Sequence, residues 1–301
     1  MQVDRAKPFL KWVGGKTQLL SQIRESLPVP VSAYHTYVEP FVGGGAVLFY
    51  MLKNYKNIKH AIINDINNEL ITTYRTIKQT PNELIEQLLD VENEFHALIT
   101  QEQRTTYFLG KRLLFNKNID CPITKSATFI FLNKTCFNGL YRVNSKGEFN
   151  VPYGKYIKPM ICDRSTILAD SELLQRVEIL CGDFSQTIDF ADAGVIFYCD
   201  PPYKPISVTS SFNSYTKENF GDEQQVRLKS FCDNLTQQGA MVLQSNSESN
   251  SGYFDELYTE YKIERVFASR MVNSDATKRG KIKELLISNY MENNRLQLSL
   301  F

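Results

Sequence analysis

The sequence has little of what marks metal-binding and disulfide-stabilised proteins. Its 301 residues include one tryptophan, three scattered histidines and six cysteines. The two closest cysteines, Cys121 and Cys136, are 15 residues apart, so there is no Cys-x-x-Cys pair and no zinc-site spacing. We therefore expect free thiols in a reducing compartment and no metal site.

Long apolar runs are also missing. The longest clean run, near Val195–Cys199, is far short of the ~20 residues of a membrane helix. The residues after Met1 lack the apolar segment of a signal peptide. The sequence thus predicts a soluble, cytoplasmic protein without a membrane partner.

Composition and charge are globular overall but uneven along the chain. The apolar fraction is 43% and the charged fraction 22%, which excludes disordered and fibrous classes. The net charge is +1, yet residues 111–158 carry nine Lys or Arg against two acids. Residues 264–283 carry six against two. Two basic stretches in a neutral protein favour one surface for a polyanion, although solvated helix faces are the simpler alternative for either stretch alone.

Short apolar segments alternate with helical ones. We expect strands near residues 36–38, 61–63, 177–181, 195–199, 241–244, 261–267 and 284–290. Such alternation predicts an α/β fold with a parallel, doubly wound sheet. Residues 67–158 interrupt it with helical, basic sequence that ends in turns and a hairpin. We expect them to form an inserted second domain, with 1–66 and 159–301 forming the first.

A glycine-rich loop follows the first expected strand. Residues 39–46 read Glu-Pro-Phe-Val-Gly-Gly-Gly-Ala, and glycines allow the backbone to pass close to a ligand. Leu48 replaces the last glycine of the dinucleotide fingerprint. Asp65 ends the next strand 20 residues after Gly45, where a carboxylate reaches ribose hydroxyls. This pattern favours a nucleoside ligand without a pyrophosphate, most commonly S-adenosylmethionine; a purely structural turn is the alternative.

Residues 15–17, Gly-Lys-Thr, imitate the end of a phosphate-binding loop. That motif requires glycine at position 10, where the sequence has Leu10. Phe9, Trp12 and Lys16 could instead supply an aromatic wall and a cation beside a ligand. Packing in the core is the alternative for Trp12.

The motif Asp200-Pro201-Pro202-Tyr203 comes directly after the strand at 195–199. Ligands of open α/β sheets bind at the carboxyl ends of strands. Proline removes a backbone donor and fixes φ, so Asp200 and the Pro201 carbonyl present rigid acceptors to an amino group. Tyr203 can stack on a planar base. We therefore expect this motif to carry the chemistry.

These motifs together resemble the Dam-type DNA adenine-N6 methyltransferases, the α group of the D12 class, which includes GATC methylases of restriction-modification systems. The matching segments are residues 8–16 (PFLKWVGGK), 39–45 (EPFVGGG), 64–67 (NDIN), 137–142 (FNGLYR), 147–154 (GEFNVPYG), 182–184 (GDF) and 200–203 (DPPY).

The resemblance implies a Rossmann-like class I methyltransferase sheet with an inserted, mostly helical target-recognition domain. It implies that Asp65 holds the ribose of S-adenosylmethionine, that Asp183 and Phe184 meet its adenine, and that residues 200–203 hold a flipped target adenine. The residues expected around the cofactor are Trp12, Lys16, Phe41, Gly43, Gly45, Asp65, Asp183, Phe184 and Asp200.

The resemblance also implies double-stranded DNA as partner, with GATC as target. Arg142 matches the guanine-reading position, Leu140 and Pro152 match thymine contacts, and Phe137 and Asn138 match residues beside the flipped base. Asn144 lies in a stretch that departs from some family members. The insert residues expected to hold DNA phosphates are Lys134, Asn144, Lys146 and Lys155. The late basic stretch with Lys278, Arg279 and Lys281 is also expected to hold the DNA backbone, with an ordinary hairpin loop as the alternative.

Other acceptors and roles remain open at this point. Cytosine N4 and a protein glutamine amide also carry an amino group, although the glutamine enzymes usually have asparagine in place of Asp200. A catalytically inert DNA-binding module is an alternative of another class. The resemblance further suggests a monomer that acts beside a cognate restriction endonuclease without a stable complex.

Overall fold

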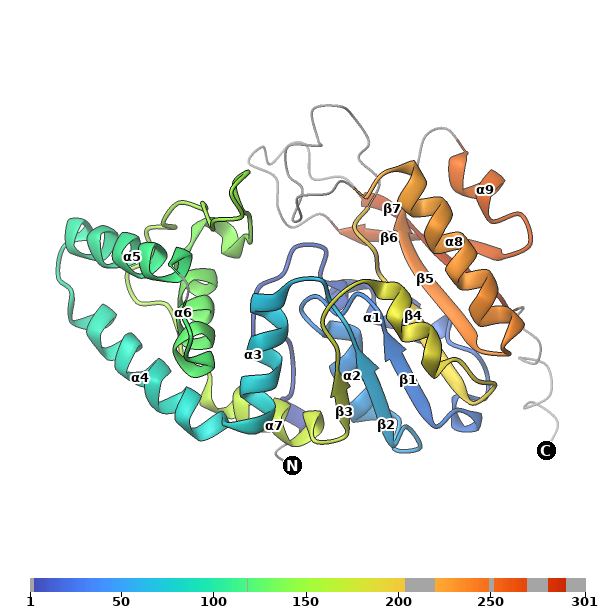
Figure 1. Ribbon diagram of the computed structural model, residues 1–301, viewed down its shortest axis with the longest axis horizontal. Helices are drawn as coiled ribbons and strands as arrows, with labels where there is room; N and C mark the ends of the chain where they lie inside the picture. The colour runs from blue at the N-terminus through green and yellow to red at the C-terminus, as the bar shows by residue number, and fades with distance from the viewer. Residues whose placement is uncertain (1–2, 118, 204–219, 249–251, 270–280, 291–301) are drawn as a thin grey trace.

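The computed structural model describes residues 3–117, 119–203, 220–248, 252–269 and 281–290 (Figure 1). One sheet of seven strands has the order β3-β2-β1-β4-β5-β7-β6. Neighbours among the first five strands are parallel, whereas β7 is antiparallel to both β5 and β6. The strands are β1 (Thr36–Glu39), β2 (His60–Ile63), β3 (Val177–Ile179), β4 (Val195–Cys199), β5 (Met241–Ser247), β6 (Lys262–Ser269) and β7 (Lys281–Ser288).

The α/β class and all seven predicted strand positions are confirmed. The expectation of a parallel sheet is wrong at one strand, β7, which runs antiparallel to both β5 and β6. A parallel connection needs a crossover of about a dozen residues or more, usually a helix. Only residues 270–280 join β6 to β7, and the two strands pair antiparallel from Lys262 with Ser288 to Ser269 with Lys281.

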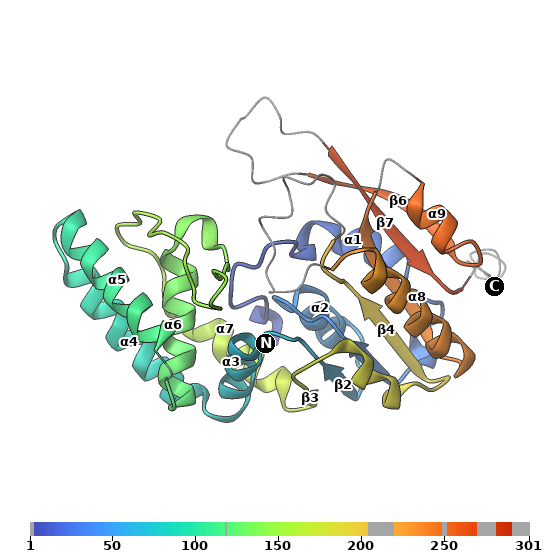
Figure 2. The ribbon, with the colours of Figure 1, turned by 45° about the horizontal axis from the view of Figure 1, so that its top comes forward.

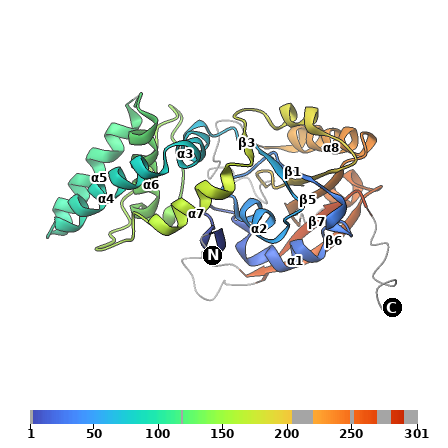
Figure 3. The same ribbon diagram turned by 90° about the horizontal axis from the view of Figure 1, so that it is seen from below.

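Helices cover both faces of the sheet, and alternate side chains of β4 divide between them. Ile196 and Tyr198 are buried in the cluster that contains α1 (Leu20–Glu25), α2 (Ala46–Asn54), α3 (Asn68–Gln79) and α7 (Arg164–Leu174). Phe197 and Cys199 point to the opposite cluster, with η5 (Phe184–Phe190) and α8 (Asp222–Gln237). Figure 3 shows α8 on one side of the strands and α1 and α2 on the other. This two-sided burial explains why β4 is apolar throughout.

The segment expected to form an insert, residues 67–158, begins with α3 and continues with further helices and a hairpin. Figures 1 and 2 both show α4 (Pro81–Ala97), α5 (Gln101–Asn116) and α6 (Pro122–Thr135) beside the sheet. Prolines occupy the first turns of α4 and α6, where no backbone donor is required. After η4 (Phe137–Gly139), antiparallel bridges join Cys136 to Tyr153 and Val143 to Phe149. The expected hairpin is thereby confirmed. The remaining short elements are η1 (Val3–Arg5), η2 (Lys16–Leu19), η3 (Val31–Ala33) and α9 (Tyr253–Leu257).

The helical insert and the sheet share apolar packing. Phe95, Phe108 and Phe131 belong to the same buried cluster as Tyr37 of β1. Across the expected boundary, the Asn133 side chain of α6 accepts from the Lys11 N–H at 2.9 Å and donates to the Lys11 carbonyl at 2.8 Å. The proposed boundaries at 66/67 and 158/159 therefore fall between parts that pack directly on each other. No helix in the described ranges is both long and apolar enough to cross a membrane.

The order of strands reverses between β1 and β4, because β2 and β3 lie on one side and β5 on the other. Open α/β sheets bind ligands at the carboxyl ends of strands beside such a reversal. Glu39 ends β1, and Asp200 follows β4 directly. The fold thus places the conspicuous acidic motif at the expected ligand-binding edge.

Replacing Phe197 by alanine tests the second core. Its ring is fully buried and lies edge-on to Phe231 of α8, at 6.3 Å between centroids. We expect F197A to lower the free energy of unfolding by about 3–5 kcal/mol through lost burial and a cavity. L113A on α5, where the side chain is 60% exposed, should cost less than about 0.5 kcal/mol. Urea denaturation of both variants checks this, and equal losses would contradict it.

Candidate functional site

Asp200 faces a buried cation. The Lys16 ammonium lies 2.8 Å from Asp200 Oδ1 and also donates to the Gly14 carbonyl at 2.8 Å. The Lys16 side chain is 4% exposed and that of Asp200 19%. Burial raises the pKa of Asp200 to about 6, although the Lys16 ammonium works in the opposite direction. The motif therefore presents a carboxylate that is anionic at neutral pH and has a fixed counterion.

Tyr203 is held by two residues from distant parts of the chain. Its hydroxyl donates to Glu284 Oε2 of β7 at 2.7 Å. The Lys16 ammonium lies 4.7 Å from the centre of its ring and 3.9 Å from Glu284 Oε2. One cluster therefore contains Lys16, Asp200, Tyr203 and Glu284.

The glycine loop has a backbone that side chains would disrupt. Gly43 and Gly45 have φ values of +47° and +73°. A Cβ on Gly43 would lie 2.9 Å from the indole Cδ1 of Trp12, and one on Gly45 would lie 2.5 Å from the hydroxyl of Tyr74. The Trp12 ring stacks in turn on Tyr141, with 5.6 Å between centroids. Glycine here thus serves a left-handed backbone and close contact with an aromatic wall.

Asp65 is bound to this loop. Its carboxylate accepts hydrogen bonds from the backbone N–H of Gly43 at 3.0 Å and of Asn67 at 2.9 Å. Burial nevertheless raises the pKa of Asp65. The neighbouring Asn64 amide donates to the carbonyls of Pro40 and Gly182, at 3.0 Å each. The segments that follow β1, β2 and β3 are therefore joined at one edge of the sheet.

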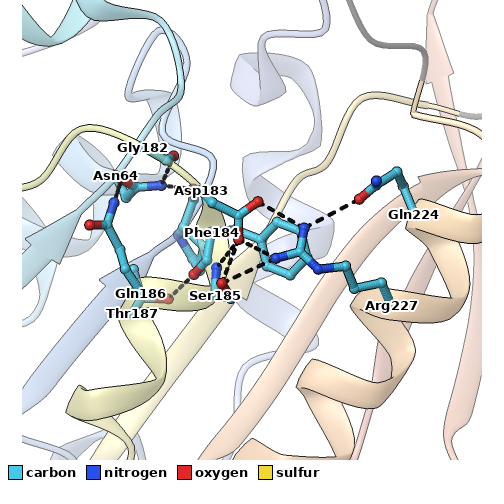
Figure 4. Close-up of polar contacts among 10 residues, drawn as sticks. Asn64, Gly182, Asp183, Phe184, Ser185, Gln186, Thr187, Gln224 and Arg227 are labelled. Carbon is cyan, nitrogen blue, oxygen red and sulfur yellow. Dashed lines mark hydrogen bonds and ion pairs between the residues drawn. The ribbon is translucent and has the colours of Figure 1, made fainter.

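Asp183 lies at that edge in a network of its own (Figure 4). It caps η5 by accepting from the Ser185 N–H at 2.9 Å, and both its oxygens accept from the Arg227 guanidinium, at 2.8 and 2.5 Å. The Arg227 hydrogen bonds lower the pKa of Asp183 to about 2. Arg227 also lies 4.6 Å from the ring centre of Phe184, which packs on Phe41 at 5.1 Å.

The structure brings the expected cofactor residues together along one edge. Trp12 lies where a side chain on Gly43 would have to go, and Asp65 accepts from the Gly43 N–H. Phe41 contacts Phe184, and Lys16 contacts Asp200. The ionised Asp183 carboxylate, the Trp12 ring and the tight turn at Gly43 suit a nucleoside ligand. Their individual contacts with a cofactor stay predictions.

The residues expected to read DNA lie on the hairpin of the insert. The Phe137 N–H donates to the Pro152 carbonyl at 2.9 Å, which places these two positions side by side. The Phe137 side chain is 52% exposed. The exposed Arg142 is oriented by the Asn150 amide oxygen, which accepts from Nε at 2.8 Å. Asn138 and the partly buried Leu140 flank them. Phe137, Asn138, Arg142 and Pro152 are exposed, and their contacts with bases stay predictions.

The expected phosphate contacts differ in their surroundings. Asn144 is engaged in the hairpin turn, because its amide oxygen accepts from the N–H of Lys146 at 2.9 Å and of Glu148 at 3.0 Å. Lys146 and Lys155 are exposed. Lys134 is half-buried, burial lowers its pKa, and it lines a cavity of about 360 Å³. Two of the remaining residues, Lys278 and Arg279, lie outside the described residues, and Lys281 begins β7.

Sequence reasoning missed several residues of this edge. Glu284 lies in a strand of mixed polar and apolar residues and Arg227 in an ordinary amphipathic helix, so neither carries a local motif. Tyr141 lies inside a matching segment but carried no assigned role. For Glu284, its place directly before the apolar run Leu285–Ile287 was the one available signal.

The comparisons with known proteins agree with this geometry. The sequence profile of the D12 class N6 adenine-specific DNA methyltransferases matches residues 12–272. The chain is 50% identical over 289 residues to the type II methyltransferase M.MjaIII of Methanocaldococcus jannaschii, covering 94% of this chain and 99% of that protein. It is 40% identical to the type II methyltransferase M1.LlaDCHI of Lactococcus lactis, over 94% and 95% of the two chains. It is 34% identical to a DNA adenine methylase of Haemophilus influenzae, over 93% and 92%.

Replacing Lys16 by methionine tests the buried ion pair. The pKa of Asp200 in the folded protein, about 6, lies above its ordinary value of 3.8. Between pH 4 and pH 6, Asp200 is therefore protonated more often in the native state than in the unfolded state. Its contribution to the free energy of unfolding decreases as the pH rises from about 4 to about 6. Without the Lys16 charge the pKa rises further. In K16M the free energy of unfolding should keep decreasing above pH 6, by up to about 1.4 kcal/mol per pH unit.

Urea unfolding at pH 5, 6, 7 and 8 measures this difference. K56M, which removes an exposed lysine on the loop after α2, is the matched control. If the stability of K16M and K56M depends on pH in the same way, Lys16 does not stabilise the Asp200 carboxylate.

Proposed function

The chain belongs to the D12 class of N6 adenine-specific DNA methyltransferases, and we propose that it uses S-adenosylmethionine to methylate the adenine of GATC in double-stranded DNA. The observation that carries the proposal is the Asp200 carboxylate, which follows β4 at the reversal of strand order with Lys16 as its counterion. Membership of this family favours adenine N6 over the cytosine and glutamine acceptors and over an inert module.

The residues at the sheet edge fit the cofactor. In this proposal Asp65 holds the ribose beside the glycine loop, while Asp183 and Phe184 meet the adenine. When bound, S-adenosylmethionine supplies a methyl group on a positively charged sulfur. Gly43 supports this arrangement, because its N–H donates to the Asp65 carboxylate at 3.0 Å and holds it at the glycine loop. Asp183 supports it as well, since Arg227 keeps its carboxylate ionised and oriented.

The target adenine must leave the duplex before it can react. Flipping a base out of the stack costs a few kcal/mol. Tyr203 recovers part of this cost by stacking on the extruded ring. The Lys16 ammonium already occupies Oδ1 of Asp200, so the proposal assigns Oδ2 and the Pro201 carbonyl to the two hydrogens of the adenine amine.

These acceptors make the amine a better nucleophile. Hydrogen bonds from both N–H groups draw the nitrogen away from the planar, conjugated geometry in which its lone pair is unavailable. The nitrogen becomes positive as it attacks, and the ionised carboxylate stabilises that charge in a partly buried site. Asp200 Oδ2 would then accept the proton that the methylated nitrogen loses. Positioning and electrostatics thus supply the catalysis, and no covalent enzyme intermediate is required.

The hairpin supports GATC as the target. An arginine fork that donates to guanine O6 and N7 is the commonest specific contact with guanine. Arg142 is exposed for such a contact, and its guanidinium is oriented through Asn150. Leu140 and Pro152 offer the neighbouring apolar surface for thymine methyl groups.

We further propose a monomer that acts beside a restriction endonuclease without forming a stable complex. The site residues and the hairpin come from one chain, so a second copy is not needed to complete them. Two relatives are named type II methyltransferases, which supports the link to restriction.

Asp200→Ala is the direct test of the proposed chemistry. Without the acceptor, methylation of a GATC plasmid should fall at least about 10³-fold, while the affinity for S-adenosylmethionine changes only a few-fold. Resistance of the plasmid to an endonuclease blocked by adenine methylation reports the activity, and calorimetry reports cofactor binding. D192A, at the opposite end of β4, should retain activity. A D200A protein with the wild-type rate would contradict the mechanism.

Arg142→Ala tests the target sequence. It should relax discrimination at the first guanine by about 1–3 kcal/mol, because one bidentate contact is lost. K146A removes an exposed charge from the same hairpin and should weaken binding to all sequences alike. Rates on GATC and on duplexes altered at the first base measure the difference. A uniform loss for R142A would assign Arg142 to the DNA backbone instead.

A further inference from the structure

Glu284 places a second carboxylate in the pocket that the proposed mechanism assigns to Asp200. Its side chain is 13% exposed and lies on β7, between β5 and β6. Its backbone pairs with Ser247 on one side and Val266 on the other. A residue that is fixed from both sides within a sheet is a rigid attachment point. Glu284 therefore differs from an acidic residue on an exposed loop, whose backbone is not held by strand pairing.

The contact with Tyr203 uses this rigidity. The phenol hydroxyl donates to Glu284 Oε2 at 2.7 Å, and burial raises the pKa of the phenol well above its ordinary value, so the hydroxyl keeps its proton. The Tyr203 ring is thereby held at one end by Glu284 and at the other by the backbone of the Asp-Pro-Pro-Tyr motif. A ring that must receive a flipped base gains from such a fixed orientation.

The contact with Lys16 adds a charge effect. The Lys16 ammonium lies 2.8 Å from Asp200 and 3.9 Å from Glu284, so the two carboxylates share one cation. Asp200 also faces Glu39 of β1, Tyr198 and Cys199 of β4, and Tyr203. Burial is the largest cause of the raised pKa of Asp200, and the nearby Glu284 carboxylate raises it further. Its charge makes Asp200 a more basic acceptor.

We propose that Glu284 is the positioning residue of the target-base pocket, which orients the Tyr203 ring and shares Lys16 with Asp200. This inference rests on the proposed function of Asp200 and Tyr203. Glu284 acts through these residues and through Lys16, without touching the reacting nitrogen. Its two effects separate chemically, since the hydrogen bond needs an acceptor oxygen and the charge effect needs an anion.

Two substitutions of Glu284 separate these effects. E284Q keeps an acceptor for the Tyr203 hydroxyl but removes the charge. Its rate at pH 8 should stay within about threefold of the wild type. The acidic limb of kcat/KM, which reports the ionisation of Asp200 in the free enzyme, should move to lower pH by about 0.5–1 unit. E284A also removes the acceptor and should lower kcat by roughly 10–100-fold, with KM for S-adenosylmethionine nearly unchanged.

A double-mutant cycle with Y203F tests whether the loss of kcat in E284A arises through the Tyr203 hydroxyl. If Glu284 acts through the Tyr203 hydroxyl, E284A combined with Y203F should be about as slow as the slower single variant. Glu178 of β3, an exposed carboxylate at the opposite edge of the sheet, offers the matched control E178Q. Thermal unfolding of each full-length variant confirms that it is folded before rates are compared.

The outcomes are distinct. A shifted acidic limb in E284Q, together with non-additive losses in the cycle, supports the positioning role. Wild-type behaviour of both Glu284 variants overturns it, and so do equal, additive losses with an unmoved limb. If the wild-type protein itself methylates no DNA, the proposed function has failed rather than the role of Glu284. If E284A does not fold, the pH profile of E284Q still decides.

Discussion

A buried ion pair between Lys16 and Asp200 connects the parts of this protein that have to meet. Lys16 comes from the N-terminal segment, and Asp200 follows the central strand β4. Burying two charges costs several kcal/mol of desolvation, which their attraction seldom recovers in full. The pair is therefore better explained by function than by stability. It keeps a carboxylate in a partly buried place and leaves it anionic near neutral pH.

The surrounding structure serves to hold that carboxylate beside its ligands. The Asn64 amide and the Asp65 carboxylate join the segments that follow β1, β2 and β3. Trp12 packs on the glycine loop and stacks on Tyr141, a residue of the insert. The shared apolar core extends from β1 to Phe149 and Val151 of the hairpin, so the hairpin that we propose to read DNA packs on the same core as the sheet. In this proposal, recognition and chemistry are coupled through direct packing.

Much of this arrangement could be predicted from sequence, because it rests on local signals. Apolar runs located the strands, three consecutive glycines located the loop, and Asp-Pro-Pro-Tyr located the acceptor. The antiparallel β7 and the partner of Tyr203 could not be predicted in this way. The direction of β7 depends on the length of one connection. Glu284 meets Tyr203 across 81 residues of sequence, because β7 pairs with β5 and β5 pairs with β4. Arg227 likewise meets Asp183 across 44 residues without a motif.

A structure of the protein with a GATC duplex and an unreactive analogue of S-adenosylmethionine tests the central claim most directly. The account predicts an extruded adenine whose N6 lies about 2.7–3.2 Å from Asp200 Oδ2 and from the Pro201 carbonyl, with its ring on Tyr203 and Lys16 still on Oδ1. An adenine that remains stacked in the duplex, or an N6 group held away from Asp200, would contradict it.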